Sequence, residues 1–238
     1  MKMRKNLLFA SVAFALATGV LTSCEWFNSD NPSPSPTPSK DTRISSVIPD
    51  DLRETIEEFI PIYDGVTPPN IEGSYHIDPE ILVASSRSND VIGAHYSPEY
   101  DRFYDQDMNK NTISLVRVQG GGSEWAKGDG AFISGYDDKF TVYFDVEGGN
   151  SGSTFKQAYI ISGIKTSVGI ANIYKGFIMK EKNDPDNHLV EVGTFRFFSD
   201  EDGISEMTDW PYAWPYNGPS AARAAARGDN TLPCENLR

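Results

Sequence analysis

Phe140-Thr141-Val142-Tyr143-Phe144-Asp145-Val146-Glu147 carries the pattern from which the fold is predicted. Side chains of a β-strand alternate between its two faces. One face of this stretch is wholly apolar, with Phe140, Val142, Phe144 and Val146. Turn residues lie on both sides of it, 137–138 before and 148–150 after. The stretch is therefore predicted to be a strand held between two turns.

Similar segments continue along the chain in both directions. They are rich in β-branched and aromatic residues, and Gly, Asn, Asp or Pro separates them. Eight or nine strands are predicted, at residues 71–77, 102–106, 112–119, 130–136, 140–147, 155–165, 170–182, 189–198 and 204–207. The turn at Asp200-Glu201-Asp202-Gly203 is expected to close a last hairpin onto 204–207.

The predicted fold class is mainly β. No predicted helix is long enough to connect parallel strands, so the sheet is expected to be antiparallel. A long twisted meander tends to close on itself, because closure removes exposed edges. We therefore predict a single up-and-down barrel of about eight strands, with a β-sandwich as the alternative.

One amphipathic helix is predicted in front of the strands. The side chains of Leu52, Ile56, Phe59, Ile60 and Tyr63 fall on one face of it, and charged residues fall on the other. A capping-box spacing begins the helix, and a proline ends it. Several predicted strands are apolar on both faces, so this helix is expected to cover part of the outer face of the sheet.

The amino-terminal residues have the layout of a bacterial lipoprotein signal. Three positive charges precede an apolar run from Leu7 to Leu21, which has about the length of a signal-peptide core. Leu21-Thr22-Ser23-Cys24 resembles a lipobox, in which signal peptidase cuts before a cysteine whose sulfur carries a diacylglycerol. We predict that residues 1–23 are a signal peptide and that acyl chains on Cys24 bind the lipid bilayer. Two or three such chains make a stable anchor.

The remaining chain divides into a tether and one domain. Residues 24–40 are predicted to be the tether, because residues 31–39 within them alternate proline with small polar residues, which is typical of an extended spacer. Residues 41–238 are long enough for one core, ending in an aromatic and alanine-rich segment. Cys234 is the only other cysteine, so no intramolecular disulfide is expected. The formal charge falls from −13 to −16 when the three positive charges of the signal are removed. This acidity argues against a nucleic-acid partner.

Residues 61–75 carry a resemblance to a known family. Pro61-Ile62-Tyr63-Asp64-Gly65, followed by Pro-Pro-Asn-Ile-Glu-Gly-Ser-Tyr at 68–75, resembles the calycin-like and lipocalin-like lipoproteins of Bacteroidetes bacteria. Gly73-Ser74-Tyr75 is similar to the Gly-x-Trp of the first lipocalin strand, with tyrosine in place of tryptophan. Residues 161–165 and 192–196 also look like that group. The resemblance covers about residues 48–200. It implies an eight-stranded meander barrel that binds a small apolar molecule, and it brings no catalytic residues. The lipid anchor predicts a place in the cell envelope, at the outer membrane, on either its periplasmic or its surface face, and Glu25 and Asp30 near Cys24 favour surface export.

The segment Trp210-Pro-Tyr-Ala-Trp-Pro-Tyr216 nearly repeats Trp-Pro-Tyr. Rigid prolines can present flat rings for stacking on a sugar or another ligand. The candidate ligand-binding residues are Trp210, Tyr212, Trp214 and Tyr216, with Trp125 as a companion. The alternative, which we favour, is that these rings plug the barrel end or cover a sheet face, because apolar rings pack more often than they bind.

Other residue patterns predict no catalytic or metal site. The three histidines lack metal-ligand spacing, and neither a nucleophile elbow nor a phosphate loop is present. We therefore predict a protein that is not an enzyme and needs no cofactor. Its expected function is to bind a small apolar or amphipathic ligand inside the barrel. The alternative is a carbohydrate- or protein-binding accessory lipoprotein that uses the aromatic segment.

Overall fold

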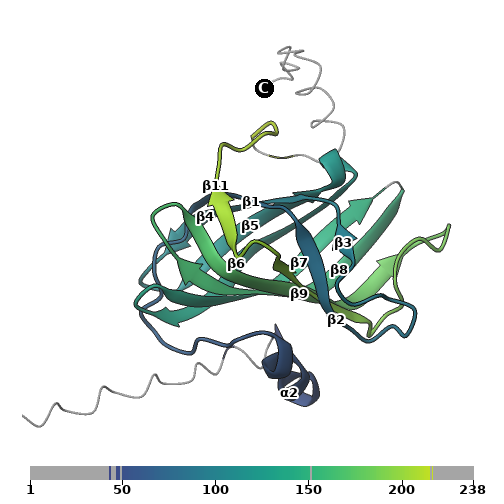
Figure 1. The fold of residues 1–238 in the computed structure, drawn as a ribbon, viewed down its shortest axis with the longest axis horizontal. Helices are drawn as coiled ribbons and strands as arrows, with labels where there is room; N and C mark the ends of the chain where they lie inside the picture. The colour runs from purple at the N-terminus through teal and green to yellow at the C-terminus, as the bar shows by residue number, and fades with distance from the viewer. Residues whose placement is uncertain (1–42, 44–46, 49, 151, 215, 217–238) are drawn as a thin grey trace, which may run out of the picture. The chain divides into compact units, whose positions relative to one another are not determined.

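The computed structural model describes residues 43, 47–48, 50–150, 152–214 and 216. They contain helix α2 (Asp50–Phe59), the 3-10 turn η1 (Gly120–Gly122) and eleven strand segments (Figure 1). The strand segments are β1 (Gly73–Ile77), β2 (Glu80–Ser85), β3 (His95–Tyr96), β4 (Glu99–Asp107), β5 (Thr112–Gln119), β6 (Glu124–Tyr136), β7 (Lys139–Asn150), β8 (Ser153–Lys165), β9 (Gly169–Asn183), β10 (Phe195–Asp200) and β11 (Ile204–Met207). All eleven belong to one antiparallel sheet, so two separate packed sheets do not describe this part of the chain.

The eleven segments group into eight longer strands. β1 and β2 are successive halves of one strand, and β3 and β4 are halves of its neighbour, because Glu80 lies opposite Tyr96 and Ile77 lies opposite Glu99 in one unbroken register. β10 and β11 both run antiparallel to β9, so they too continue one another. The mainly β, antiparallel meander predicted from the sequence is confirmed for β4 through β9, which pair in chain order.

The pairing of β11 with β9 closes the sheet into a ring. Along the sheet the order runs from β11 through β1 and β4 to β9, and Ser205 of β11 lies opposite Ile170 of β9. The name "ring" is used below for these eight paired strands, β1, β4 to β9 and β11. Because the first and last strands pair, the ring leaves no long unpaired edge.

The predicted hairpin at residues 200–203 is wrong. β10 and β11 do not pair with each other; they lie one after the other along β9, with Ser199 opposite Tyr174 and Ile204 opposite Ala171. The acidic turn residues form a bulge instead, which adds residues to one strand without reversing it. β2 was missed, because the proline at position 79 suggested the end of a strand where the chain only bends.

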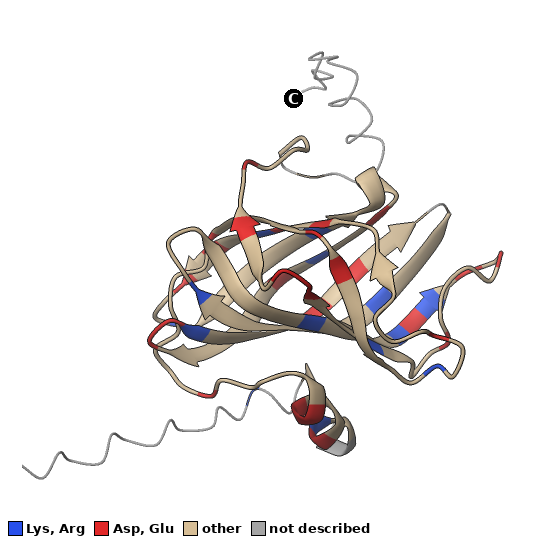
Figure 2. Ribbon diagram, viewed as in Figure 1, with Lys and Arg blue, Asp and Glu red and all other residues tan. Residues whose placement is uncertain are grey.

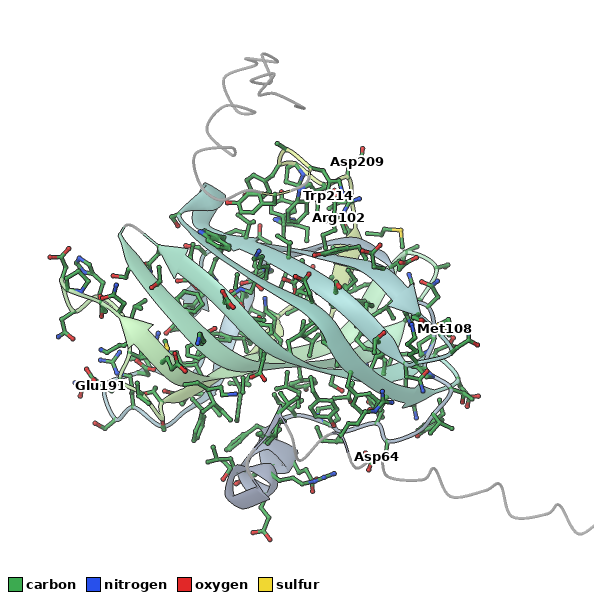
Figure 3. The ribbon with its side chains drawn as sticks, turned by 180° about the vertical axis from the view of Figure 1, so that it is seen from behind. Asp64, Arg102, Met108, Glu191, Asp209 and Trp214 are labelled. Carbon is green, nitrogen blue, oxygen red and sulfur yellow. The ribbon has the colours of Figure 1, made fainter. Side chains whose placement is uncertain are left out.

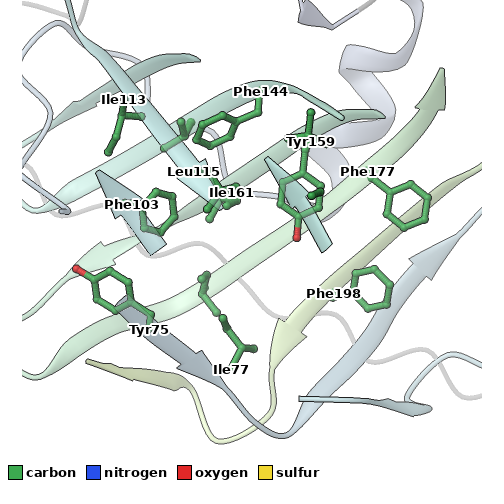
Figure 4. Packing of buried hydrophobic residues seen from close by; sticks show 14 of the residues in the cluster. Tyr75, Ile77, Phe103, Ile113, Leu115, Phe144, Tyr159, Ile161, Phe177 and Phe198 are labelled. Carbon is green, nitrogen blue, oxygen red and sulfur yellow. The ribbon is translucent and has the colours of Figure 1, made fainter. Parts of the chain in front are cut away.

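The interior of the ring is packed with apolar side chains at one end. Tyr75, Phe103, Ile113, Leu115 and Phe144 come from four strands, β1, β4, β5 and β7, and point into the same space (Figure 4). The segment at residues 66–71 lies at this end, because its backbone bonds with Gly135, Asn111 and Gln106, where β4, β5 and β6 begin or end. We call the opposite end, which carries Gln119, Glu124, Asn150 and His188, the mouth.

Helix α2 packs against the outer face of the sheet (Figure 1). Ile56 and Ile60 are fully buried against a second apolar cluster, which includes Tyr143, Ile160 and Phe197. The helix ends at Phe59, so Ile60 and Tyr63 of the predicted 52–63 helix lie after it. Ile56 in the helix and Ile60 just after it cover part of the outer face of the sheet. The predicted signal peptide, Cys24, the tether and Cys234 lie outside the described residues.

Candidate functional site

The ring contains a small cavity at its mouth, with a volume of about 150 Å³. Four of its residues, Gln119, Glu124, Asn150 and His188, also line a hollow on the surface, so the cavity opens at this end. Its walls are apolar, and its floor is charged. The wall residues are Phe155, Phe177, Met179, Leu189, Val190 and Phe198; the polar and charged residues are Glu80, Glu99, Arg117, Gln119, Glu124, Asn150, Gln157, His188 and Arg196.

Four buried charged side chains form what we call the ionic floor: Glu80, Glu99, Arg117 and Lys175. Lys175 Nζ lies 2.5 Å from Glu99 Oε1 and 3.0 Å from Glu80 Oε1. Arg117 Nε lies 3.0 Å from Glu99 Oε2. None of the four side chains is more than 4% exposed. Charges this deeply buried are expected only where they are paired.

Strand alternation places these charges inside the ring. Lys175 lies between Ile173 and Phe177 on the inward face of β9, and Arg117 follows Leu115 on the inward face of β5. In the same way, Glu99 and Phe103 share a face of β4. Charged side chains therefore occupy positions within the strands and not only in the loops (Figure 2).

The ionisation of the floor follows from these contacts. Burial raises the pKa of Glu99, but the positive charges of Arg117 and Lys175 outweigh it and lower the pKa to about 2. Burial also lowers the pKa of Lys175, and the negative charges of Glu80 and Glu99 reverse this and raise it well above its usual value. Lys175 and Glu99 are therefore both charged at neutral pH.

Asp101, which lies beside the ionic floor on β4, behaves in the opposite way. Burial first, and then the negative charge of Glu99, raise its pKa well above the usual value. Its two carboxyl oxygens accept no hydrogen bond from the described residues. The neutral form of Asp101 is therefore favoured over its charged form. Burial also raises the pKa of Glu80, although Lys175 opposes this shift.

Polar side chains surround the mouth above the floor. Gln119 Nε2 donates to Glu80 Oε2 at 2.6 Å, and Arg117 donates to Glu124 Oε1 at 2.8 Å. Asn150 Nδ2 donates to Glu124 Oε2 at 3.3 Å. Gln157 lies between Phe155 and Tyr159 on the inward face of β8 and is 3% exposed. The cavity can therefore offer hydrogen bonds and an apolar surface to the same small molecule.

The predicted aromatic residues lie elsewhere, on the outer face of the ring. Trp210, Tyr212 and Tyr216 form a cluster over Val116 and Val118 of β5. Their rings contact one another edge to face, with centroids 5.3 Å apart for Trp210 and Tyr212. Trp125 also belongs to this cluster, and its ring centroid lies 6.3 Å from that of Tyr216. The five predicted residues are thus brought together, but as a cover over a sheet face and not inside the cavity.

Trp214 is the most exposed member of the aromatic segment, with 43% of its surface accessible. The Arg102 guanidinium lies 4.1 Å from the centre of its ring, and Tyr104 meets its ring edge to face. Figure 3 shows Trp214, Arg102 and Asp209 beside one another. They line an open hollow of about 480 Å³. Trp214 therefore keeps an accessible edge beside charged groups.

The sequence analysis did not identify the cavity residues as a site. A signal was present: Lys175, Arg117 and Gln157 each lie two positions from apolar residues that share their strand face. On its own, each of these residues is equally compatible with the solvent face of a two-sided strand. The clustering became apparent only once the register of four strands was known.

Comparisons with protein-family models, with curated proteins and with solved structures gave no match to this chain. In the described part of the chain, no helix has the length and apolar character needed to cross a membrane. Likewise, the described side chains include no group of three or more His, Cys, Asp or Glu residues placed to hold a metal ion.

Proposed function

We propose that this protein is a non-enzymatic binding protein, a lipocalin-like barrel that holds a small amphipathic ligand at its mouth. It is attached to the cell envelope, most simply the outer membrane, through acyl chains on Cys24. The mouth cavity is the observation that carries this proposal. A concave site with apolar walls and a few placed polar groups is the usual form of a small-molecule site.

The cavity favours an amphipathic ligand over a wholly apolar one. Phe155, Phe177 and Val190 offer apolar contact, but Glu80 and Arg117 lie at the floor of the same space. Apolar atoms placed against these groups would displace their hydration without replacing its hydrogen bonds. At about 150 Å³ the cavity is also smaller than the roughly 300–1,000 Å³ of typical ligand pockets. The bound part of the ligand is therefore small and has a polar end.

Native mass spectrometry of the full chain carrying Cys24→Ser, isolated from its source organism, tests this proposal. We expect an adduct that is lost on denaturation. Val190→Trp fills the cavity and should abolish the adduct, whereas Val192→Trp is the matched control, because Val192 is 56% exposed and outside the cavity. A bare mass for the Cys24→Ser chain, or an adduct that survives Val190→Trp, would contradict the proposal.

The anchor has a separate test. Cells grown with labelled palmitate should incorporate the label into the wild-type chain and not into Cys24→Ala. Cys234→Ala removes the other cysteine and should keep the label. Equal labelling of Cys24→Ala and wild type would rule out lipidation at Cys24.

A second candidate function is carbohydrate binding on the outer face. The exposed Trp214, with Arg102 and Asp209 in the same hollow, favours it. An indole edge beside charged hydrogen-bonding groups suits a sugar. A glycan array with wild type and Trp214→Ala distinguishes this candidate, because only a platform site loses signal in the variant.

A further inference from the structure

The two cations that line the cavity are already paired. Arg117 forms ion pairs with Glu99 and Glu124, with nitrogen–oxygen distances of 3.0 and 2.8 Å. Arg196 forms two hydrogen bonds to Asp90, at 2.7 and 2.9 Å. Paired guanidinium groups are poorly placed to bind an anionic ligand, because the anion would have to compete with a carboxylate already in contact.

Two hydrogen-bond acceptors in the cavity lining have no donor. Asn150 Oδ1 and Gln157 Oε1 are buried and accept no hydrogen bond from the described residues. The amide of Asn150 is oriented by the bond from its Nδ2 to Glu124, which leaves the oxygen as the unused group. A buried acceptor without a donor is unfavourable, so a ligand that donates a hydrogen bond gains from meeting it.

Carboxyl groups also outnumber cations around the cavity. Three carboxyl groups line the cavity, Glu80, Glu99 and Glu124, and the two buried cations that pair with them are Lys175 and Arg117. A bound cation would offset this excess, whereas a bound anion would add to it.

We infer that the mouth cavity selects a small molecule with a cationic, hydrogen-bond-donating head, an ammonium group on a short apolar body. This inference rests on the proposed ligand-binding function and deepens it. The ammonium donates to the amide oxygens of Asn150 and Gln157 beside Glu124. The apolar body contacts Phe155, Phe177 and Val190. A cationic donor forms stronger hydrogen bonds than a neutral one, so the charge raises both affinity and selectivity.

Three probes with the same six-carbon chain test the head group: hexylammonium, hexanol and hexanoate. Their binding to the full chain carrying Cys24→Ser is measured by isothermal titration calorimetry at pH 7. We expect hexylammonium to bind roughly tenfold more tightly than hexanol, and hexanoate to show no binding. Hexanoate or hexanol binding as tightly as hexylammonium would overturn the inference and leave the proposed function standing.

Two variants locate the effect. Glu124→Gln removes one negative charge from the mouth and should reduce the preference for hexylammonium over hexanol severalfold. Glu147→Gln makes the same change at an exposed site outside the cavity and should keep the preference. Gln157→Leu is a second test. It leaves the ion pairs intact and should weaken the binding of hexylammonium. An unchanged preference in both Glu124→Gln and Gln157→Leu would overturn the inference.

The failure of the inference differs from the failure of the proposed function. If native mass spectrometry shows an adduct but none of the three probes binds, the cavity holds a ligand with another head group, and the inference is wrong. If there is neither an adduct nor probe binding, the proposed function is wrong as well.

Discussion

Lys175 is a lysine with no accessible surface in the interior of the ring. Its Nζ contacts Glu80 and Glu99, so its loss would leave two buried carboxylates with too little positive charge. Breaking a buried ion pair from one side typically costs about 3–5 kcal/mol. We therefore expect Lys175→Met to lower the free energy of unfolding by about this amount in urea denaturation.

The matched control is Lys180→Met in the same strand. Lys180 pairs with Asp145 at 2.6 Å, but both side chains are largely exposed, at 43% and 58%. Exposed pairs contribute about 0–1 kcal/mol, so this variant should remain close to wild type. Equal losses in the two variants would show that burial of the pair is not what matters. Combining Lys175→Met with Glu80→Gln should recover part of the loss, because it removes one unpaired charge.

Asp101 makes the stability depend on pH. Its folded pKa is raised by burial and by Glu99 above the unfolded value near 3.8. Its contribution to stability is therefore fully present below that value and is lost as the pH rises through the folded pKa. Asp101→Asn keeps the shape and removes the titration. We expect the variant to be more stable than wild type at pH 7, because folding no longer has to protonate a buried carboxyl group.

The pH dependence distinguishes this cause from a simple packing effect. At pH 4 the unfolded carboxyl is already partly protonated, so the advantage of Asp101→Asn should shrink toward zero. Urea denaturation of both chains at pH 4 and pH 7 measures it. The same difference at both pH values would show that Asp101 is not protonated in the folded protein.

At the residue scale, the site was harder to predict from sequence than its surroundings. In strand 112–119, Ile113 and Leu115 lie on one face and Val116 and Val118 lie on the other, so both faces of the strand look apolar. The pattern therefore does not show whether the side chain of Arg117 faces the solvent or the interior. Arg117 can face inward because it pairs with Glu99, which lies 18 positions earlier in the chain. Residue patterns within one strand carry no information on this pairing.

At the element scale, helix α2 is expected to contribute to stability through one face. Ile56 is 1% exposed and packs against the outer cluster on β7, β8 and β10. Large-to-alanine changes at such positions cost about 2–5 kcal/mol. Ile56→Ala should lower the free energy of unfolding by this amount, measured by urea denaturation. Glu58→Ala, on the exposed face of the same helix, should change it by less than about 0.5 kcal/mol. A loss of similar size in both variants would mean that helix propensity, and not packing, holds α2.

The elements themselves were predicted to different degrees. Strand 112–119 has the bounds of β5, because polar turn residues and a glycine run define both of its ends. β6 begins at Glu124, six residues before the predicted start at 130, because the break caused by the glycine run at 120–122 ends sooner than expected. The acidic run at 200–203 has the composition of a hairpin turn. Only the partner strand β9 shows that the chain goes on in the same direction.

At the scale of the whole molecule, the ring depends on residues far apart in the chain. β1 near the beginning and β9 near the end both pair with β11, so closure waits for the last strand. Such long-range pairing is slow to form, since the entropy of a long loop must be offset first. Two of the three long strands that are split into segments, β1 with β2 and β10 with β11, lie where this closure occurs.

The aromatic segment gives the last test, because it follows the final strand and covers the outside of the ring. Val116 and Val118 are 3% and 0% exposed beneath the rings of Trp210, Tyr212 and Tyr216. A chain that ends at Thr208 keeps every strand of the ring but exposes these side chains. Full burial of a valine is worth roughly 1.5–3 kcal/mol, so we expect the truncated chain to stay folded and to lose about 2–5 kcal/mol. Trp214→Ala, which removes the exposed ring alone, should cost less. Circular dichroism and urea denaturation measure both. If the truncated chain is as stable as wild type, the segment is not a structural cover, and its rings are then free to serve the carbohydrate-binding alternative.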